Sequence, residues 1–336
     1  MSSFALKASF AAVVVTISFS ASAQWAGLGD YGLFGTYDLP IQTPDSTTQY
    51  EASAVAWNRN TNTLFIVGDG GQYVQQVRLD GSVINSMTLG LATGPSRIGV
   101  EFDDLEGLAW VGGSTFVMIE ERKRNAVRFD YAAGTTLNRD NTSTVKLGTS
   151  VGNKGLEGIT YDGSNSFILV NQAAGSGASQ NIFQTSITFD GAGGSATNGS
   201  SSTANATSLF TPENIGFADL NDVYALSNIA AFAGAASNNL LVLTNAGGLK
   251  EMTRAGAVVS QLTLPNDVPG VGTAQIEGVT MDDRGYIYLV SDNGDFDTNQ
   301  FSSSLFVYAP VPEPETYALL LAGLAVLSGA ARRRKQ

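Results

Sequence analysis

The sequence predicts an all-β protein built as a five-bladed β-propeller, with six blades as the alternative count. Short runs rich in Val, Ile, Thr and Phe alternate with Gly, Asn and Asp turns, which is typical of β-strands. One pattern of paired strands recurs five times, and internal periods of about 40 to 50 residues are typical of propeller blades. With 336 residues, the chain is long enough to bury one large core.

Each copy of the repeat begins with a small or acidic residue and has two apolar strands joined by a polar turn. The five copies lie at residues 50–71, 104–123, 155–172, 225–248 and 275–295. One or two more strands follow each copy, as in residues 73–89, where Asp80 and Gly81 form a turn. Residues 32–40 are predicted to complete the last blade from outside, because an open ring would expose its edges.

The composition excludes several classes of function. The chain has no cysteine and no histidine, which rules out disulfides, thiolate or histidine metal sites and Ser-His-Asp triads. Its net charge of -12 argues against a nucleic-acid partner, because phosphate binding needs a clustered basic face.

The first 23 residues have the layout of a secretory signal peptide. Lys7 precedes an apolar run at residues 10–19, and a small-residue cleavage site ends at Ala23. The propeller domain is therefore predicted to occupy residues 24–310.

Residues 311–336 have the layout of a second sorting signal. Pro312, Glu313 and Pro314 precede an apolar segment at 317–331, predicted to be a transmembrane helix, and four basic residues follow it. This order resembles the PEP-CTERM signal of Gram-negative bacteria that make extracellular polysaccharide. The resemblance implies that a membrane peptidase, the exosortase, removes the tail. The protein would then pass from a transient membrane anchor to the cell surface or extracellular matrix.

Two positions in each repeat carry oxygen-bearing side chains that a propeller would bring to one mouth of its channel. The reason is that the first strand of a blade starts where the second one ends. The start positions are Ser53, Glu106, Glu157, Ser227 and Glu277. The end positions are Asp69, Glu121, Gln172, Asn245 and Asp292.

Six carboxylates in a partly desolvated funnel would repel one another unless a cation neutralised them. Ca²⁺ accepts six to eight oxygen ligands, and this chain offers nothing for softer metals. We therefore predict a Ca²⁺ cofactor held by Glu106, Glu157, Glu277, Asp69, Glu121 and Asp292, with Ser53, Gln172, Ser227 and Asn245 as further candidates on the rim.

Other interpretations of these acids stay open. The glutamates could accept hydrogen bonds from neighbouring strand ends or face water, because a Glu-Gly step also suits a tight strand entry. Glu120 could pair with the basic residues at 122–124 as solvated surface charge. Asp103 and Asp104 stand just before the strand and could add ligands, although a plain acidic loop is the preferred interpretation.

The chain resembles the SdiA-regulated family of bacterial β-propellers over most of residues 35–310. The similarity rests on the sequences DDLEGLAW at 103–110, EERKRNAV at 120–127, GLEGITYD at 155–162 and IEGVTMDDRGYIYLVSDNG at 276–294. It implies a five-bladed propeller with a calcium site. The chain departs from the family at Ser53 and Ser227, which replace acidic residues, and at a Gly/Ser/Thr-rich insertion near 173–207.

Two functions are compatible with these features. The preferred one is a non-catalytic, calcium-stabilised module that binds a polysaccharide, peptide or surface protein outside the cell. The alternative is a calcium-dependent hydrolase of phosphoesters or lactones, with Glu157 or Glu277 as the base. The binding module is preferred because a phosphate substrate needs Lys or Arg beside the metal, and only residues 122–124 could supply them.

Overall fold

The computed structural model describes most of the propeller region. The described residues are 25, 27–39, 51–69, 71–91, 101–148, 150, 155–172, 182–189, 195–197, 207–210, 219–229, 232, 235–244, 248–264, 267–268, 272–273, 275–292, 303–311 and 323. The predicted signal peptide, Pro312, Glu313, Pro314 and the segment at 317–331 lie outside them, Gly323 excepted. No helix among the described residues is long and apolar enough to span a membrane.

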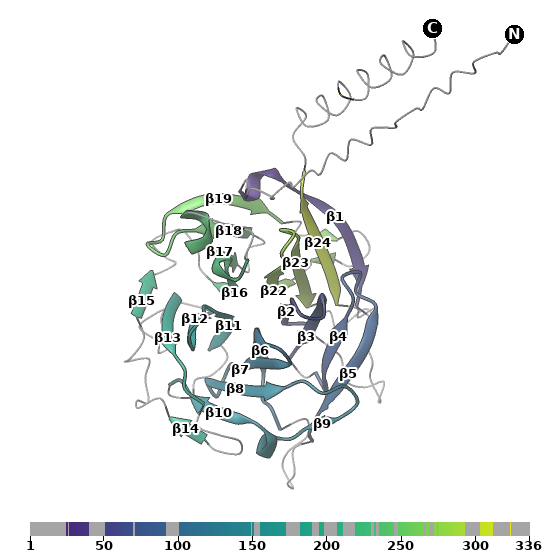
Figure 1. The fold of residues 1–336 in the computed structure, drawn as a ribbon, viewed down its shortest axis with the longest axis vertical. Coiled ribbons are helices and arrows are strands. Elements are labelled where there is room, and N and C mark those ends of the chain that lie inside the picture. Colours follow the sequence, from purple (N-terminus) through teal and green to yellow (C-terminus); the bar gives the residue numbers. More distant parts are fainter. Residues whose placement is uncertain are drawn as a thin grey trace, which may run out of the picture.

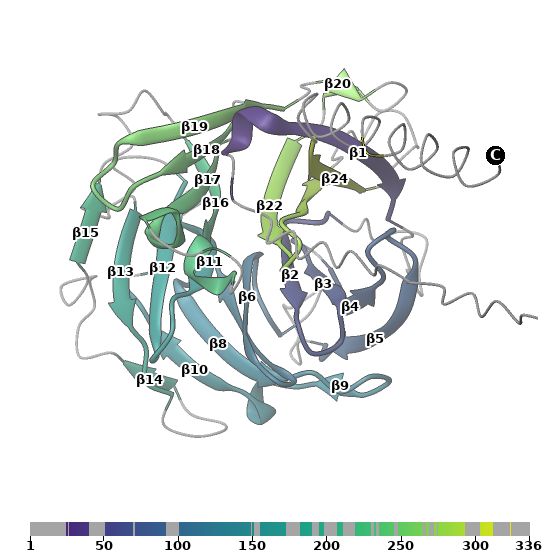
Figure 2. The same cartoon turned by 45° about the horizontal axis from the view of Figure 1, so that its top comes forward.

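Five β-sheets surround a common centre, which confirms the five-bladed propeller over the six-bladed alternative (Figures 1 and 2). Each blade is a meander whose first strand is innermost.

The blades are numbered here in chain order. Blade 1 contains β2 (Ala54–Asn58), β3 (Thr63–Val67), β4 (Tyr73–Val77) and β5 (Val83–Leu89). Blade 2 contains β6 (Leu105–Gly112), β7 (Thr115–Glu120), β8 (Asn125–Asp130) and β10 (Ser143–Lys146). Blade 3 contains β11 (Leu156–Tyr161), β12 (Ser166–Asn171), β13 (Ile182–Ser186) and β15 (Thr207–Phe210).

Blade 4 contains β16 (Leu220–Ala225), β17 (Leu240–Thr244), β18 (Gly248–Met252) and β19 (Val258–Thr263). Blade 5 contains β22 (Gln275–Met281), β23 (Ile287–Asp292), β24 (Ser304–Pro310) and β1 (Tyr31–Asp38). The minor strands are β9 (Thr136–Leu137) on blade 1, β14 (Ser195–Thr197) on blade 2, and the pair β20 (Asp267–Val268) and β21 (Gly272–Thr273). Short 3-10 helices are η1 (Leu28–Asp30), η2 (Arg139–Asn141), η4 (Leu226–Asn228) and η5 (Ala235–Asn238).

The N-terminal strand closes the ring, as the sequence predicts for residues 32–40. β1 pairs antiparallel with β24 as the outer strand of blade 5, so the beginning and the end of the described propeller share one sheet. A buried hydrogen bond strengthens the closure, because the Tyr31 hydroxyl donates to the Gly285 carbonyl at 2.7 Å.

The innermost strands of four blades contain a β-bulge near their first residue. In blades 2 to 5 the pairing of the first two strands shifts by one residue near its start, so that one residue has no register partner. These β-bulge residues are Glu106, Glu157, Asn221 and Glu277. A bulge re-aims a side chain without ending the strand, so it gives these residues a shared orientation in the ring.

Glycine follows three of the bulges because neighbouring inner strands approach closely there. A Cβ atom on Gly158 would lie 2.4 Å from Asp222 Oδ1 and 2.6 Å from Asp222 Cα in the next blade. A Cβ atom on Gly278 would lie 2.9 Å from the Val55 amide nitrogen across the closure of the ring. The Glu-Gly step therefore reflects both a bulge and the tight contact between blades.

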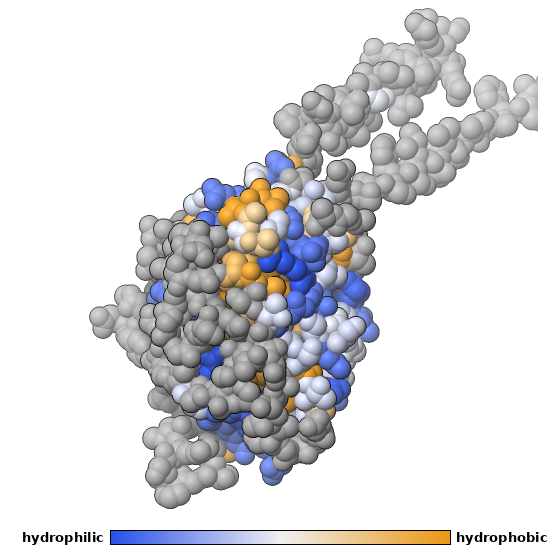
Figure 3. All heavy atoms as spheres, turned by 90° about the vertical axis from the view of Figure 1, so that its left-hand side faces the viewer, coloured by the Kyte–Doolittle hydropathy of each residue, from blue (hydrophilic) through white to orange (hydrophobic). Residues whose placement is uncertain are grey.

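The core lies between adjacent blades. One cluster joins blades 1 and 2 through Phe65 and Phe116, whose ring centres are 4.5 Å apart. The outer surface is mixed in character, and Figure 3 shows an apolar area on one side of the ring with hydrophilic atoms next to it. The exposed apolar residues of β19 are Val258 and Val259.

We expect Gly158→Ala to destabilise the protein by about 1–3 kcal/mol, because the added methyl group would collide with the backbone of blade 4. Chemical denaturation measures this change in the free energy of unfolding. Gly29→Ala is the matched control, since a Cβ atom at Gly29 meets no atom within 4 Å. Equal stability of the two variants would contradict the close packing of the inner strands.

Candidate metal centre

A cavity of about 200 Å³ lies at the mouth where the inner strands begin. Of the ten described residues that line it, seven are carboxylates and one, Arg122, is a cation. The lining residues are Glu51, Ser53, Asp69, Asp104, Glu106, Glu121, Arg122, Glu157, Gln172 and Glu277. Seven residues that the repeat pattern selected therefore meet in one place: Ser53, Asp69, Glu106, Glu121, Glu157, Gln172 and Glu277.

Blade 4 does not follow the alignment made from the sequence. Ser227 lies on η4 at the opposite mouth, where its hydroxyl donates to Asp162 Oδ1 at 2.9 Å. The bulge position of blade 4 belongs to Asn221, whose amide Nδ2 donates to the Ile276 carbonyl at 2.8 Å. The placement of Ser227 on the rim was wrong because an Asn-Asp pair stands where blades 2, 3 and 5 have Glu-Gly.

The remaining predicted residues are not placed in the cavity. Asn245 lies outside the described residues. Asp292 ends β23, and its backbone pairs with Gln275. For these two residues, a role at the metal centre stays a prediction.

Sequence reasoning missed one carboxylate of the cavity, Glu51, and preferred a non-ligand interpretation for another, Asp104. Asp104 and Glu51 each stand two residues before a predicted position, Glu106 and Ser53, and residues two apart in an extended strand face the same side. Asp104 was interpreted as part of an acidic loop, yet its side chain is almost completely buried. The i, i+2 spacing was the available signal, whereas the positive φ of Asp104 (58°) cannot be read from sequence.

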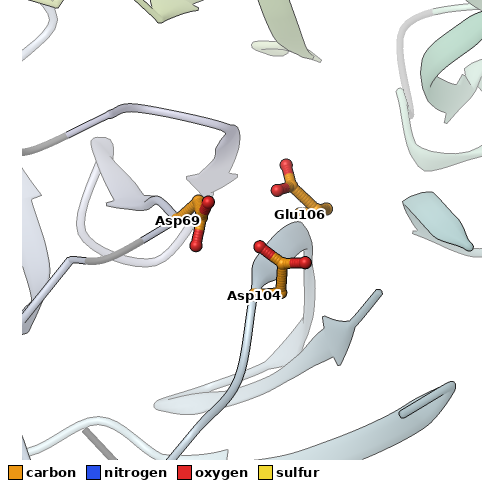
Figure 4. A group of neighbouring side chains, drawn as sticks. All are labelled: Asp69, Asp104 and Glu106. Carbon is orange, nitrogen blue, oxygen red and sulfur yellow. The ribbon is translucent and has the colours of Figure 1, made fainter. Parts of the chain in front are cut away.

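Three carboxylates form the centre of the cavity. Asp69, Asp104 and Glu106 each have a carboxylate oxygen within 4.8 Å of the other two (Figure 4). Asp69 follows β3 in blade 1, and the other two stand at the start of β6 in blade 2. The centre thus spans the contact between two blades.

Local hydrogen bonds hold these side chains in place. Ser53 Oγ accepts from the Asp69 amide at 3.1 Å, so this predicted rim residue orients the backbone of a carboxylate. Glu121 Oε1 accepts from the Gly155 amide of blade 3 at 2.9 Å. Arg122 Nε lies 2.8 Å from Asp104 Oδ2, in an ion pair whose angles are not those of a hydrogen bond.

Burial and like charge raise the pKa values of the acids. The pKa of Asp104 rises from 3.8 to about 9, first because burial disfavours its charge and then through hydrogen bonds and repulsion from Glu121 and Asp69. The pKa values of Glu106 and Glu157 are also raised well above their ordinary value, by burial first and by neighbouring carboxylates second. Without a cation, the cavity therefore retains protons at neutral pH.

Glu120 has a separate, structural role. Its side chain is fully buried, and its Oε1 lies 2.5 Å from Arg139 Nη2 and 3.6 Å from Lys123 Nζ. Asn125 Nδ2 also donates to it, at 2.7 Å. Glu120 is thus a buried ion-pair residue outside the cavity, and the sequence-based interpretation as solvated surface charge was wrong.

Two family models match the chain, one over the propeller region and one over the C-terminal tail. The SdiA-regulated family model matches residues 33–296, and the PEP-CTERM protein-sorting motif matches residues 310–335.

Three solved structures that match the chain are distant in sequence. A luciferin-regenerating enzyme matches at 12% identity and a TM-score of 0.44, covering 82% of this chain and 95% of that one. The Neurospora crassa Pan2 WD40 domain matches at 12% identity and a TM-score of 0.40, covering 85% and 97%. A catalytically inactive virginiamycin B lyase from Staphylococcus aureus with quinupristin matches at 12% identity and a TM-score of 0.37, covering 79% and 68%.

In the presence of a chelator, we expect the melting temperature to fall as the pH rises from about 5 to 9. A carboxyl whose pKa is raised on folding stabilises the protein below its unfolded pKa, and this contribution is lost as pH rises through the folded value, about 9 for Asp104. Thermal unfolding across this pH range measures the slope. The Asp104→Asn variant has no titratable carboxyl at this position, so its melting temperature should depend less on pH. A wild-type melting temperature that rises with pH would contradict the raised pKa of Asp104.

Proposed function

The chain belongs to the SdiA-regulated family, and we propose that it is an exported, calcium-binding propeller that acts as a binding module. The observation that carries this proposal is the gathering of seven carboxylates and one arginine in a single cavity. Such an excess of negative charge in a partly buried site is costly unless protons or a cation compensate it.

The chemistry of the cavity favours Ca²⁺ over other cations. Its acidic side chains are hard oxygen donors, and Ca²⁺ tolerates the irregular geometry that side chains from several blades impose. Asp69, Asp104 and Glu106 would form the first group of ligands, because their oxygens already lie within 4.8 Å of one another. Glu121, Glu157 and Glu277 line the same cavity and would complete the oxygen shell.

The sorting motif indicates the place of action. The PEP-CTERM match implies export and processing by an exosortase-type enzyme. We extend this to a signal peptide at residues 1–23, a transient membrane segment at 317–331, and final display at the cell surface or in the extracellular matrix. A polysaccharide, a peptide or a surface protein is the proposed partner class.

Arg122 is the feature of the cavity that would serve the alternative, a calcium-dependent hydrolase of phosphoesters or lactones. It is the one cation among the described lining residues. Its guanidinium already contacts Asp104 at 2.8 Å and Asp103 at 3.9 Å, so binding a substrate phosphate would require breaking these pairs. Lys123 and Arg124 are directed to Glu120 and Asn171, respectively. This arrangement favours binding over hydrolysis.

We expect Glu106→Gln to raise the stability of the calcium-free protein but to abolish its stabilisation by calcium. The substitution relieves repulsion in the cavity and at the same time removes a ligand. At a calcium concentration 100 times the dissociation constant, the wild type should gain about 2.7 kcal/mol. Thermal unfolding with calcium and with EDTA measures both effects.

Asp38→Asn is the control for this experiment, because Asp38 is exposed on the outer strand β1. It should respond to calcium like the wild type. A purely structural role for Glu106 predicts the reverse pattern, namely a loss of stability in EDTA and an unchanged response to calcium.

We expect no turnover of 4-nitrophenyl phosphate or of simple lactones by the calcium-loaded protein. The physical reason is the lack of an unpaired cation beside the carboxylates among the described residues of the cavity. Release of 4-nitrophenol and of protons measures the two reactions. Calcium-dependent turnover that Glu157→Gln removes would instead establish the hydrolase.

A further inference from the structure

A second pocket lies at the opposite end of the same inner strands. It has a volume of about 320 Å³, within the usual range of small-molecule sites, and shares no lining residue with the acidic cavity. Each of the five inner strands contributes to its wall. The pocket is therefore an integral feature of the ring rather than a gap between surface loops.

Aromatic side chains form much of this wall. Trp57, Trp110, Tyr161 and Tyr224 line the pocket. Three of them have their polar atoms bound within the protein: Trp57 Nε1 donates to Asn62 Oδ1 at 3.3 Å, Trp110 Nε1 to the Gly113 carbonyl at 3.0 Å, and the Tyr224 hydroxyl to the Met281 carbonyl at 3.2 Å. These bonds fix the rings, so their apolar surfaces are what a ligand would meet.

The charges near this pocket are balanced in pairs. At the rim, Arg59 forms a two-pronged ion pair with Asp283, with distances of 2.7 and 2.8 Å. Behind Ser227, Asp162 forms a similar pair with Arg254 at 2.6 and 2.8 Å. Among the residues that the structure describes, the pocket thus offers neither a free cation for an anionic ligand nor a free carboxylate for a cationic one.

The Arg59 guanidinium also argues against a cationic ligand. Its central carbon lies 5.8 Å from the centre of the Trp57 ring, the place that a ligand cation would take in an aromatic cage. A wholly apolar ligand fits poorly as well, because it would desolvate the exposed Ser227 and the half-buried Asn228 without replacing their contacts with water.

A sugar ring satisfies both requirements. It presents C–H groups on one face, which can pack on an aromatic ring, and hydroxyls at its edge, which can bond to Ser227, Asn228 and the Arg59–Asp283 pair. We propose that this aromatic pocket binds a neutral pyranose, either free or at the end of a polysaccharide chain. This site goes beyond the proposed calcium centre and does not depend on it.

Tryptophan fluorescence provides a direct readout, because two of the three tryptophans in the chain line the pocket. We would titrate the full propeller with neutral methyl pyranosides of the common hexoses and N-acetylhexosamines. At least one of them is expected to give a saturable change, both with calcium and with EDTA. Calorimetry would confirm the affinity.

Variants test the location of this binding. Trp110→Ala removes a half-buried ring and should weaken binding by at least about tenfold. Ser227→Ala removes an exposed hydroxyl without opening the core and should weaken it about fivefold. Phe34→Ala is the control, because Phe34 is 63% exposed on β1 and lies outside the pocket. All three should keep the calcium response of the melting temperature.

The proposal is overturned if no methyl pyranoside gives a saturable response, or if Trp110→Ala and Ser227→Ala bind as tightly as the wild type. It is also overturned if binding requires calcium and disappears in Glu106→Gln, since the sugar would then lie at the acidic cavity. A lost calcium response with intact sugar binding would instead contradict only the metal centre.

Discussion

Repulsion among carboxylates at one mouth of the channel is the constraint on which the rest of the structure depends. The fold cannot relieve it by spreading the blades, because β1 pairs with β24 and closes the ring. Neither can the inner strands separate, since Gly158 and Gly278 bring adjacent blades into backbone contact. The acids must therefore share protons or share a cation, and the pKa of Asp104 is raised first by burial and then by its acidic neighbours Glu121 and Asp69.

Blade 4 shows how the protein limits this repulsion. Its bulge residue is an amide, Asn221, and the next residue is Asp222 in place of glycine. The two oxygens of Asp222 accept from the amides of Val223 and Val279, each at 2.8 Å. This acid thus joins blade 4 to blade 5 instead of lining the cavity, and burial raises its pKa well above the ordinary value.

Local patterns explain how much could be predicted from the sequence. The five copies, the closing strand and the meeting of Glu106, Glu157 and Glu277 all follow from strand alternation and a repeated Glu-Gly step, which are short-range features. The sequence favoured a plain acidic loop for Asp104, because the residues it interacts with, Asp69 and Glu121, come from other segments of the chain. Glu120 was misread for the same reason, since its partner Arg139 lies beyond the next strand. Blade 4 lacks the Glu-Gly step, and the sequence alignment therefore placed Ser227 at the acidic mouth although it lies at the opposite one.

The acidic cavity at one mouth of the channel affects which ligands the aromatic pocket at the other mouth can bind. Trp110 lies four positions after Glu106 on the same inner strand, a distance of about 13 Å along an extended chain. Across that distance, with an effective dielectric constant near 20, a pair of unit charges still interacts by about 1 kcal/mol. An anionic ligand in the aromatic pocket would be repelled by the acidic cavity, and a cationic one by a bound metal ion. Paired charges and a neutral ligand make the second pocket nearly independent of the state of the first.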